Sequence, residues 1–80
     1  MEFTLTEHAR KRCARRGIDT KWVAAALQHS IDTFPDLVDP DATHVRFEVP
    51  ERGFRTLRVV INDTVDPVQV ITAFFESATN

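Results

Sequence analysis

The apolar residues of this 80-residue chain change their spacing near residue 30. Before that point they recur at helical intervals, and one helical face carries Trp22, Val23, Ala26 and Leu27. After it, apolar and polar side chains alternate, as they do in strands with one buried face. The chain is therefore expected to have an α+β fold, in which helices are followed by strands.

Two helices are predicted before the change of period. The segment 7–16 contains neither Pro nor Gly, and Gly17 supplies a C-terminal stop. Either Thr6 or Thr4 is placed to cap its first turn, the latter with a Glu three residues on. A second helix begins at residue 19 or 20 and runs to residue 29. We expect the two helices to form a short N-terminal hairpin.

The strands that follow should form an antiparallel meander of three to four strands, with the helical hairpin packed on one face. Residues 3–5 are either a short lead-in strand or a staple. The other predicted strands are 31–34, 44–49, 54–62 and 68–75. The length suits one domain over residues 1–80, and residues 1–3 and 77–80 are expected to fray.

Strand register is constrained because a slip of one residue would turn every apolar side chain to the wrong face. We therefore expect Val59 to lie opposite Val45 on one neighbouring strand and opposite Ile71 on the other. This pairing turns seven apolar side chains towards the helices: Val45, Phe47, Leu57, Val59, Ile61, Ile71 and Ala73. The opposite face then carries His44, Arg46, Glu48, Thr56, Arg58, Val60, Val70, Thr72 and Phe74.

In this register Arg46, Arg58 and Thr72 form one row across three strands. Two adjacent arginines repel each other unless an anion lies over them, and guanidinium groups match phosphate oxygens. The row is thus a candidate phosphate site, with His44 at its side and Phe74 as a surface on which a base could stack. The alternative is an ordinary solvent-exposed face whose charge Glu48 partly neutralises.

The first helix is basic on one side. On a helical wheel Ala9 and Cys13 point inward, while His8, Arg12 and Arg15 form a stripe with Arg16 at its border. A neutral imidazole at residue 8 would be able to accept a proton. The three arginines are candidate phosphate-binding residues. The alternative is a surface histidine on a basic helix.

Nothing in the sequence indicates a metal or a cofactor. Cys13 is the only cysteine, the three histidines have no metal-ligand spacing, and the Asp-rich loop 35–43 lacks the pattern of a calcium loop. Two glycines are too few for a phosphate-binding loop. No apolar run is long enough to span a membrane and the start does not read as a secretion signal, so a cytoplasmic protein is expected.

The run Thr6-Glu7-His8-Ala9, followed by Arg12 and by Arg16-Gly17-Ile18, resembles the opening signature of a small bacterial family. Members of that family are similar to RelE-type toxins. Two strand segments resemble it as well, Leu57-Arg58-Val59-Val60-Ile61 and Val70-Ile71-Thr72-Ala73-Phe74. The resemblance extends over about residues 4–75.

This resemblance implies the fold shared by barnase, EndoU, colicin and RelE-like domains. Many of these are metal-independent ribonuclease toxins, and their partners are a cognate antitoxin or an immunity protein. His8 matches the helix histidine of the family, Arg12 and Arg16 match the arginines that follow it, and Thr72 matches the threonine of the last strand. Many relatives place a tyrosine after that threonine, but this chain has no tyrosine. A phenol therefore cannot act as acid or base here.

The resulting hypothesis is an endoribonuclease toxin that cleaves tRNA or mRNA, free or on the ribosome. His8 would deprotonate a 2′-hydroxyl, and Arg58 and Arg46, with Arg12, would stabilise charge on the phosphate as a 2′,3′-cyclic phosphate forms. If His8 is remote, the site consists of His44, Arg46, Arg58 and Thr72.

The alternative hypothesis is a non-catalytic binding module, or a toxin that inhibits a protein target. The absence of tyrosine and of an adjacent carboxylate–histidine pair favours it. The acidic loop 32–41 would then be an interface.

Overall fold

A computed structural model describes residues 2–77, which form two helices and a five-stranded sheet. The sheet has the order β1-β5-β4-β3-β2, and its last four strands form an antiparallel meander. The elements are β1 (Phe3–Leu5), α1 (Glu7–Arg16), α2 (Thr20–Gln28), β2 (Asp32–Pro35), β3 (Ala42–Val49), a 3₁₀ turn (Pro50–Arg52), β4 (Arg55–Asn62) and β5 (Val68–Phe75). The α+β class is confirmed.

The sheet is larger than the predicted three to four strands, and it is mixed rather than antiparallel. The segment predicted as a lead-in strand or a staple is β1, which pairs in parallel with the beginning of β5, Phe3 opposite Val68 and Leu5 opposite Val70. Residue 3, which was expected to fray, is thus paired with the sheet. Residues 1 and 78–80, also predicted to fray, lie outside the described residues.

Helix α1 begins and ends where its capping signals indicate. The Thr6 hydroxyl accepts a hydrogen bond from the amide of Ala9 at 3.0 Å, so Thr6 and not Thr4 is the N-cap. Gly17 ends the helix with a left-handed φ of 65°. Ala9 and Cys13 are buried, which confirms the predicted inner face. Burial raises the pKa of the Cys13 thiol.

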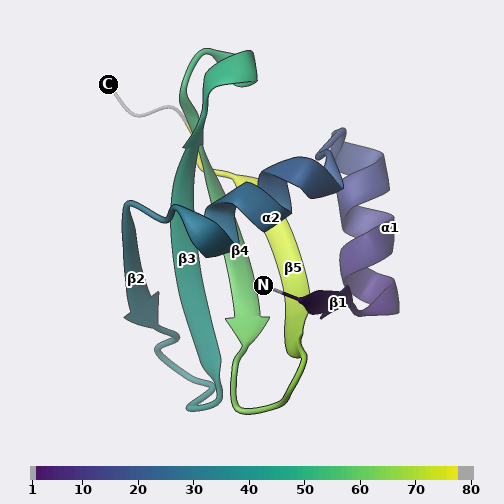
Figure 1. Cartoon of the computed structure of the whole chain (residues 1–80), viewed down its shortest axis with the longest axis vertical. Helices are drawn as coiled ribbons and strands as arrows, with labels where there is room; N and C mark the ends of the chain where they lie inside the picture. Colours follow the sequence, from purple (N-terminus) through teal and green to yellow (C-terminus); the bar gives the residue numbers. More distant parts are fainter. Residues whose placement is uncertain (1, 78–80) are drawn as a thin grey trace.

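The two helices cover the same face of the sheet without forming a packed hairpin (Figure 1). Helix α1 stands along the β5 edge, and α2 runs across β3 and β4 at a steep angle to α1. Each helix buries its apolar stripe against the sheet. The resulting core includes Val23 and Ala26 from α2 and Leu57 and Val59 from β4. Neither helix within residues 2–77 has the length and apolar content needed to cross a membrane.

The predicted pairing of β3 with β4 is confirmed, because Val45 lies opposite Val59 and Arg46 opposite Arg58. The predicted pairing of β4 with β5 is wrong. Val59 lies opposite Ala73 instead of Ile71, and the register shifts between Val60 and Ile61.

A β-bulge explains the second difference. Thr72 pairs with Val60 and Val70 pairs with Ile61, so Ile71 is the extra residue of the bulge. Val70, predicted on the polar face, is fully buried in the core. Ile71, predicted to face the helices, is only half-buried. An alternation rule assumes a regular ladder and therefore fails at such a position.

We expect the substitution Thr6→Ala to lower the free energy of unfolding by about 2 kcal/mol. The Thr6 hydroxyl caps α1 and also donates a hydrogen bond to the Ile71 carbonyl at 3.2 Å, so it connects the helix to β5. Urea unfolding followed by circular dichroism measures the change. Thr4→Ala is the matched control, because Thr4 is exposed, and it should stay within about 0.5 kcal/mol of the wild type. Equal losses in the two variants would contradict this account of the cap.

Candidate functional site

The face of the sheet that the helices leave open, here called the outer face, collects the site residues that were predicted on the strands. Two rows of paired residues cross it. The first consists of Asp32, Arg46, Arg58 and Phe74, and the second of Phe34, His44, Val60 and Thr72. Thr72 thus lies opposite Val60, and Phe74 takes the place beside Arg58 that was predicted for Thr72.

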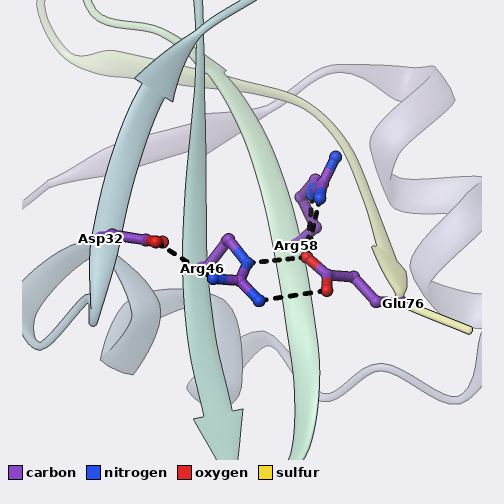
Figure 2. Close-up of polar contacts among 4 residues, drawn as sticks. All are labelled: Asp32, Arg46, Arg58 and Glu76. Atoms are coloured by element: carbon purple, nitrogen blue, oxygen red, sulfur yellow. Dashed lines mark hydrogen bonds and ion pairs between the residues drawn. The ribbon is translucent and has the colours of Figure 1, made fainter. Parts of the chain in front are cut away.

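The carboxylate of Glu76 lies between the two arginines of the first row (Figure 2). Arg46 donates to it through Nε at 2.8 Å and through Nη2 at 3.3 Å. Arg58 donates through Nε at 3.0 Å and through Nη2 at 2.8 Å, both to Oε2. Arg46 also donates to Asp32 at 3.0 Å. The anion predicted over the arginine pair is therefore a carboxylate of the chain itself.

Backbone pairing holds Glu76 at this position. Its amide donates to the Thr56 carbonyl at 2.9 Å, which extends the pairing of β5 with β4 by one residue. The hydrogen bond from Arg46, followed by that from Arg58, lowers the pKa of the Glu76 carboxyl. The same contact raises the pKa of Arg46. The site therefore holds an ionised carboxylate between two guanidinium groups.

His44 in the second row forms a close pair with Asp36, with 2.7 Å between Nε2 and Oδ1. Asp36 also accepts hydrogen bonds from the amides of Asp39 and Val38. The bond from Asp39, followed by those from His44 and Val38, lowers the pKa of Asp36 to about 2. The His44 ring stacks on Phe34 at 5.0 Å, and its Nδ1 is buried without a partner among the described residues. A carboxylate–histidine pair therefore does exist on this face, contrary to the argument used for a binding module.

Aromatic rings flank the second arginine. The guanidinium carbon of Arg58 lies 5.0 Å from the centre of the Phe34 ring and 5.7 Å from that of Phe74. Both distances are within the range of cation–π contact. Arg58 is thus held by Glu76 and by two rings, which restrict its rotamers. A guanidinium fixed in this way loses little conformational entropy when it binds an anion.

The residues predicted on α1 are distributed differently. His8 and Arg15 are exposed and Arg12 is half-buried, and none of their three side chains forms a hydrogen bond or ion pair with another residue of the described chain. Arg16 instead donates to the Ala73 carbonyl of β5 at 2.9 Å. No polar contact within residues 2–77 joins the stripe on α1 to Arg46.

An open groove of about 470 Å³ lies at the Arg16 end of this stripe. It is lined by Arg16, Arg55, Phe74 and Phe75. Phe74 therefore borders both the groove and the outer face. The groove was not predicted, because it joins residues from α1, β4 and β5 whose proximity depends on the tertiary fold.

Glu76 and Asp36 were not predicted as site residues either. Glu76 has the same parity as Thr72 and Phe74, which were assigned to the outer face, so extending the alternation by one step would have placed it there. Asp36 gave no comparable signal because it lies in an irregular loop. Within residues 2–77 no three His, Cys, Asp or Glu side chains are grouped so that they could hold a metal ion.

The low pKa of Asp36 leads to a prediction about how the stability of the fold changes in acid. Its carboxyl titrates at about 2 in the folded protein, below its ordinary value of 3.8. The stability it contributes is present above pH 3.8 and is lost as the pH falls towards 2. Asp36→Asn should therefore lose less stability than the wild type over this interval, as measured by urea unfolding at a series of pH values.

Asp63→Asn is the matched control for that experiment, because Asp63 is exposed and forms no hydrogen bond or ion pair with another described residue. Its pH profile should run parallel to that of the wild type. An Asp36→Asn profile that also runs parallel would contradict the assigned role of the Asp36–His44 pair.

Comparisons with known proteins identify the family of the chain. No curated protein and no solved structure matches the chain. A family model described as a domain of unknown function, DUF4258, matches residues 5–75. That segment contains both helices, the last residue of β1 and the whole of strands β2 to β5. It includes the two rows of the outer face, and Glu76 lies just beyond it. The chain belongs to the DUF4258 family.

Proposed function

We propose that this protein is a metal-independent endoribonuclease whose site lies on the outer face. The observation that carries the proposal is the Glu76 carboxylate held between Arg46 and Arg58, beside the His44–Asp36 pair. RNA cleavage through its own 2′-hydroxyl needs a base, an acid and positive charge at the phosphate. These residues supply all three. The resemblance to RelE-type toxins supports the same class of reaction.

In the proposed reaction Glu76 accepts the proton of the 2′-hydroxyl. The 2′-oxygen attacks the adjacent phosphorus, the bond from phosphorus to the 5′-oxygen breaks, and His44 gives a proton to the departing oxygen. The products are a 2′,3′-cyclic phosphate and a 5′-hydroxyl. The guanidinium groups of Arg46 and Arg58 stabilise the charge that develops on the phosphoryl oxygens.

The arginine pair also connects substrate binding to the strength of the base. In the free protein the two guanidinium groups hold the pKa of Glu76 low. A phosphate that shares their N–H groups weakens that hold and raises the affinity of the carboxylate for a proton. Asp36 binds Nε2 of His44, which leaves Nδ1 as the donor. Because Nδ1 is buried, the mechanism requires the side chains over it to move when RNA binds.

The proposal reassigns the base from His8 to Glu76. His8 remains the residue that the family resemblance indicates, and the two assignments differ in their consequences for mutation. Thr72 and Phe74 border the site on β5 and would contact the substrate. The proposed substrate is tRNA or mRNA, free or on the ribosome, and the proposed protein partner is an antitoxin or immunity protein.

A second candidate function is a toxin that grips a protein target without cleaving RNA. The β2–β3 loop favours it, because Leu37 and Val38 are almost fully exposed there beside Asp39 and Asp41. Exposed apolar residues rimmed by charge are typical of protein interfaces. This candidate predicts intact RNA in every assay.

We expect the purified protein to cleave tRNA or total RNA in EDTA and to leave 2′,3′-cyclic phosphate ends. Glu76→Gln should reduce the cleavage rate by at least about 100-fold, since it removes the base. His44→Asn should also reduce it. His8→Asn should stay within about twofold of the wild type. End-labelled RNA on denaturing gels gives the rates, and circular dichroism checks that each variant is folded.

The outcomes separate the hypotheses. Loss of cleavage in His8→Asn with full activity in Glu76→Gln would move the base to α1 and overturn the assignment made here. Intact RNA with the wild type, both free and with ribosomes added, would refute the ribonuclease and leave the protein-binding candidate.

A further inference from the structure

We infer that the groove between α1 and the end of β5 is a subsite for single-stranded RNA, next to the proposed cleavage site. The inference rests on the proposed function for the identity of the ligand as RNA. The groove itself is defined by its four lining residues, Arg16, Arg55, Phe74 and Phe75. Two guanidinium groups and two phenyl rings provide what a nucleotide needs, namely positive charge for its phosphate and an apolar plane for its base.

The cations of the groove are fixed in place without being neutralised. Arg16 is anchored by its bond to the Ala73 carbonyl at 2.9 Å. The guanidinium carbon of Arg55 lies 4.7 Å from the centre of the Phe75 ring. Neither residue forms an ion pair with an acidic side chain among residues 2–77, and both are exposed. Their positive charge is therefore available to an anion, in contrast to that of Arg46.

Arg52 supports the Phe75 side of the groove. It donates to the Gly17 carbonyl at 3.2 Å, and its guanidinium carbon lies 5.6 Å from the Phe75 ring and 5.5 Å from the Trp22 ring. It likewise has no ion pair within the described chain. Arg52 and Arg55 both contact Phe75, which leaves Phe74 as the ring on which a base is expected to stack.

Phe74 connects the groove to the proposed site. It lines the groove and also lies 5.7 Å from the guanidinium carbon of Arg58, which binds Glu76. A strand whose scissile phosphate lies over Arg46 and Arg58 can therefore place its neighbouring nucleotide against Phe74. The phosphate of that nucleotide would then lie between Arg16 and Arg55.

The stacking surface selects single-stranded RNA. A base can lie against Phe74 only when it is released from its own stack, and the bases of a duplex are not. The volume of about 470 Å³ lies within the range typical of small-molecule sites, which is enough for a nucleotide. Contacts to a phosphate and to a ring face, without groups placed to read base edges, predict weak sequence preference.

Binding is measured with RNA in which every 2′-hydroxyl is methylated, because such RNA lacks the nucleophile and cannot be cleaved. Fluorescence anisotropy gives the Kd of a labelled single strand and of the same strand in a duplex. We expect the single strand to bind more tightly. Phe74→Leu should weaken its binding about tenfold, because the substitution keeps an apolar side chain and removes the ring.

Arg55→Ala tests the charge of the groove, with Arg10→Ala as its matched control. Arg10 is an exposed arginine that does not line the groove. Arg55→Ala should lower the slope of log Kd against log salt concentration by about 0.7, the value for one lost phosphate contact on a single strand. Arg10→Ala should leave that slope unchanged.

The inference is overturned if the duplex binds as tightly as the single strand, if Phe74→Leu binds like the wild type, or if Arg55→Ala and Arg10→Ala have equal effects. If the wild type cleaves RNA and any of these results is obtained, the proposed function is kept and the subsite is refuted. Groove-dependent binding of methylated RNA, with no cleavage of ordinary RNA either free or with ribosomes added, would refute the ribonuclease and keep the subsite.

Discussion

One extra residue in β5 decides which side chains meet on the outer face. At its beginning β5 pairs with β1 and turns Val70 into the core, and Ile71 then forms the bulge. Beyond the bulge the alternation is reversed, so that Thr72, Phe74 and Glu76 face outward. In an unbroken ladder with Val70 inside, Glu76 would point towards the helices, where an unpaired carboxylate is costly. Arg58 would then have no ion-pair partner among the described residues, and Arg46 would keep only Asp32.

The arginines of this protein occupy two environments that differ in their balance of charge. On the outer face Glu76 and Asp32 compensate Arg46 and Arg58, so the face is organised but nearly neutral. In the groove the guanidinium groups are held by backbone carbonyls and aromatic rings, which fix their positions without cancelling their charge. A chain with a net charge of −2 thus still presents a cationic surface, and the overall charge is a poor guide to its ligands.

The features of the fold that could be predicted from the sequence are those that short-range signals determine. The limits of α1 follow from Thr6 and Gly17, and the pairing of β3 with β4 follows from two alternating strands joined by a short turn. Long-range features were not accessible in this way. The bulge breaks the parity rule, β1 pairs with a strand more than 60 residues away, and the arginines that hold Glu76 precede it by 18 and 30 residues. The site on the outer face was therefore half predicted, with its cations but without its carboxylates.

The contact of α1 with β5 has a consequence for the order of folding. The first helix of the chain docks on the last strand, and the Thr6 hydroxyl reaches across 65 residues to the Ile71 carbonyl. Until β5 has been synthesised, α1 has no surface on which to bury Ala9 and Cys13, and a ten-residue helix is marginal on its own. Assembly must therefore wait for a contact between residues 65 positions apart, a topology that slows folding. The same delay keeps Arg46 and Arg58 apart from Glu76 until the sheet is complete.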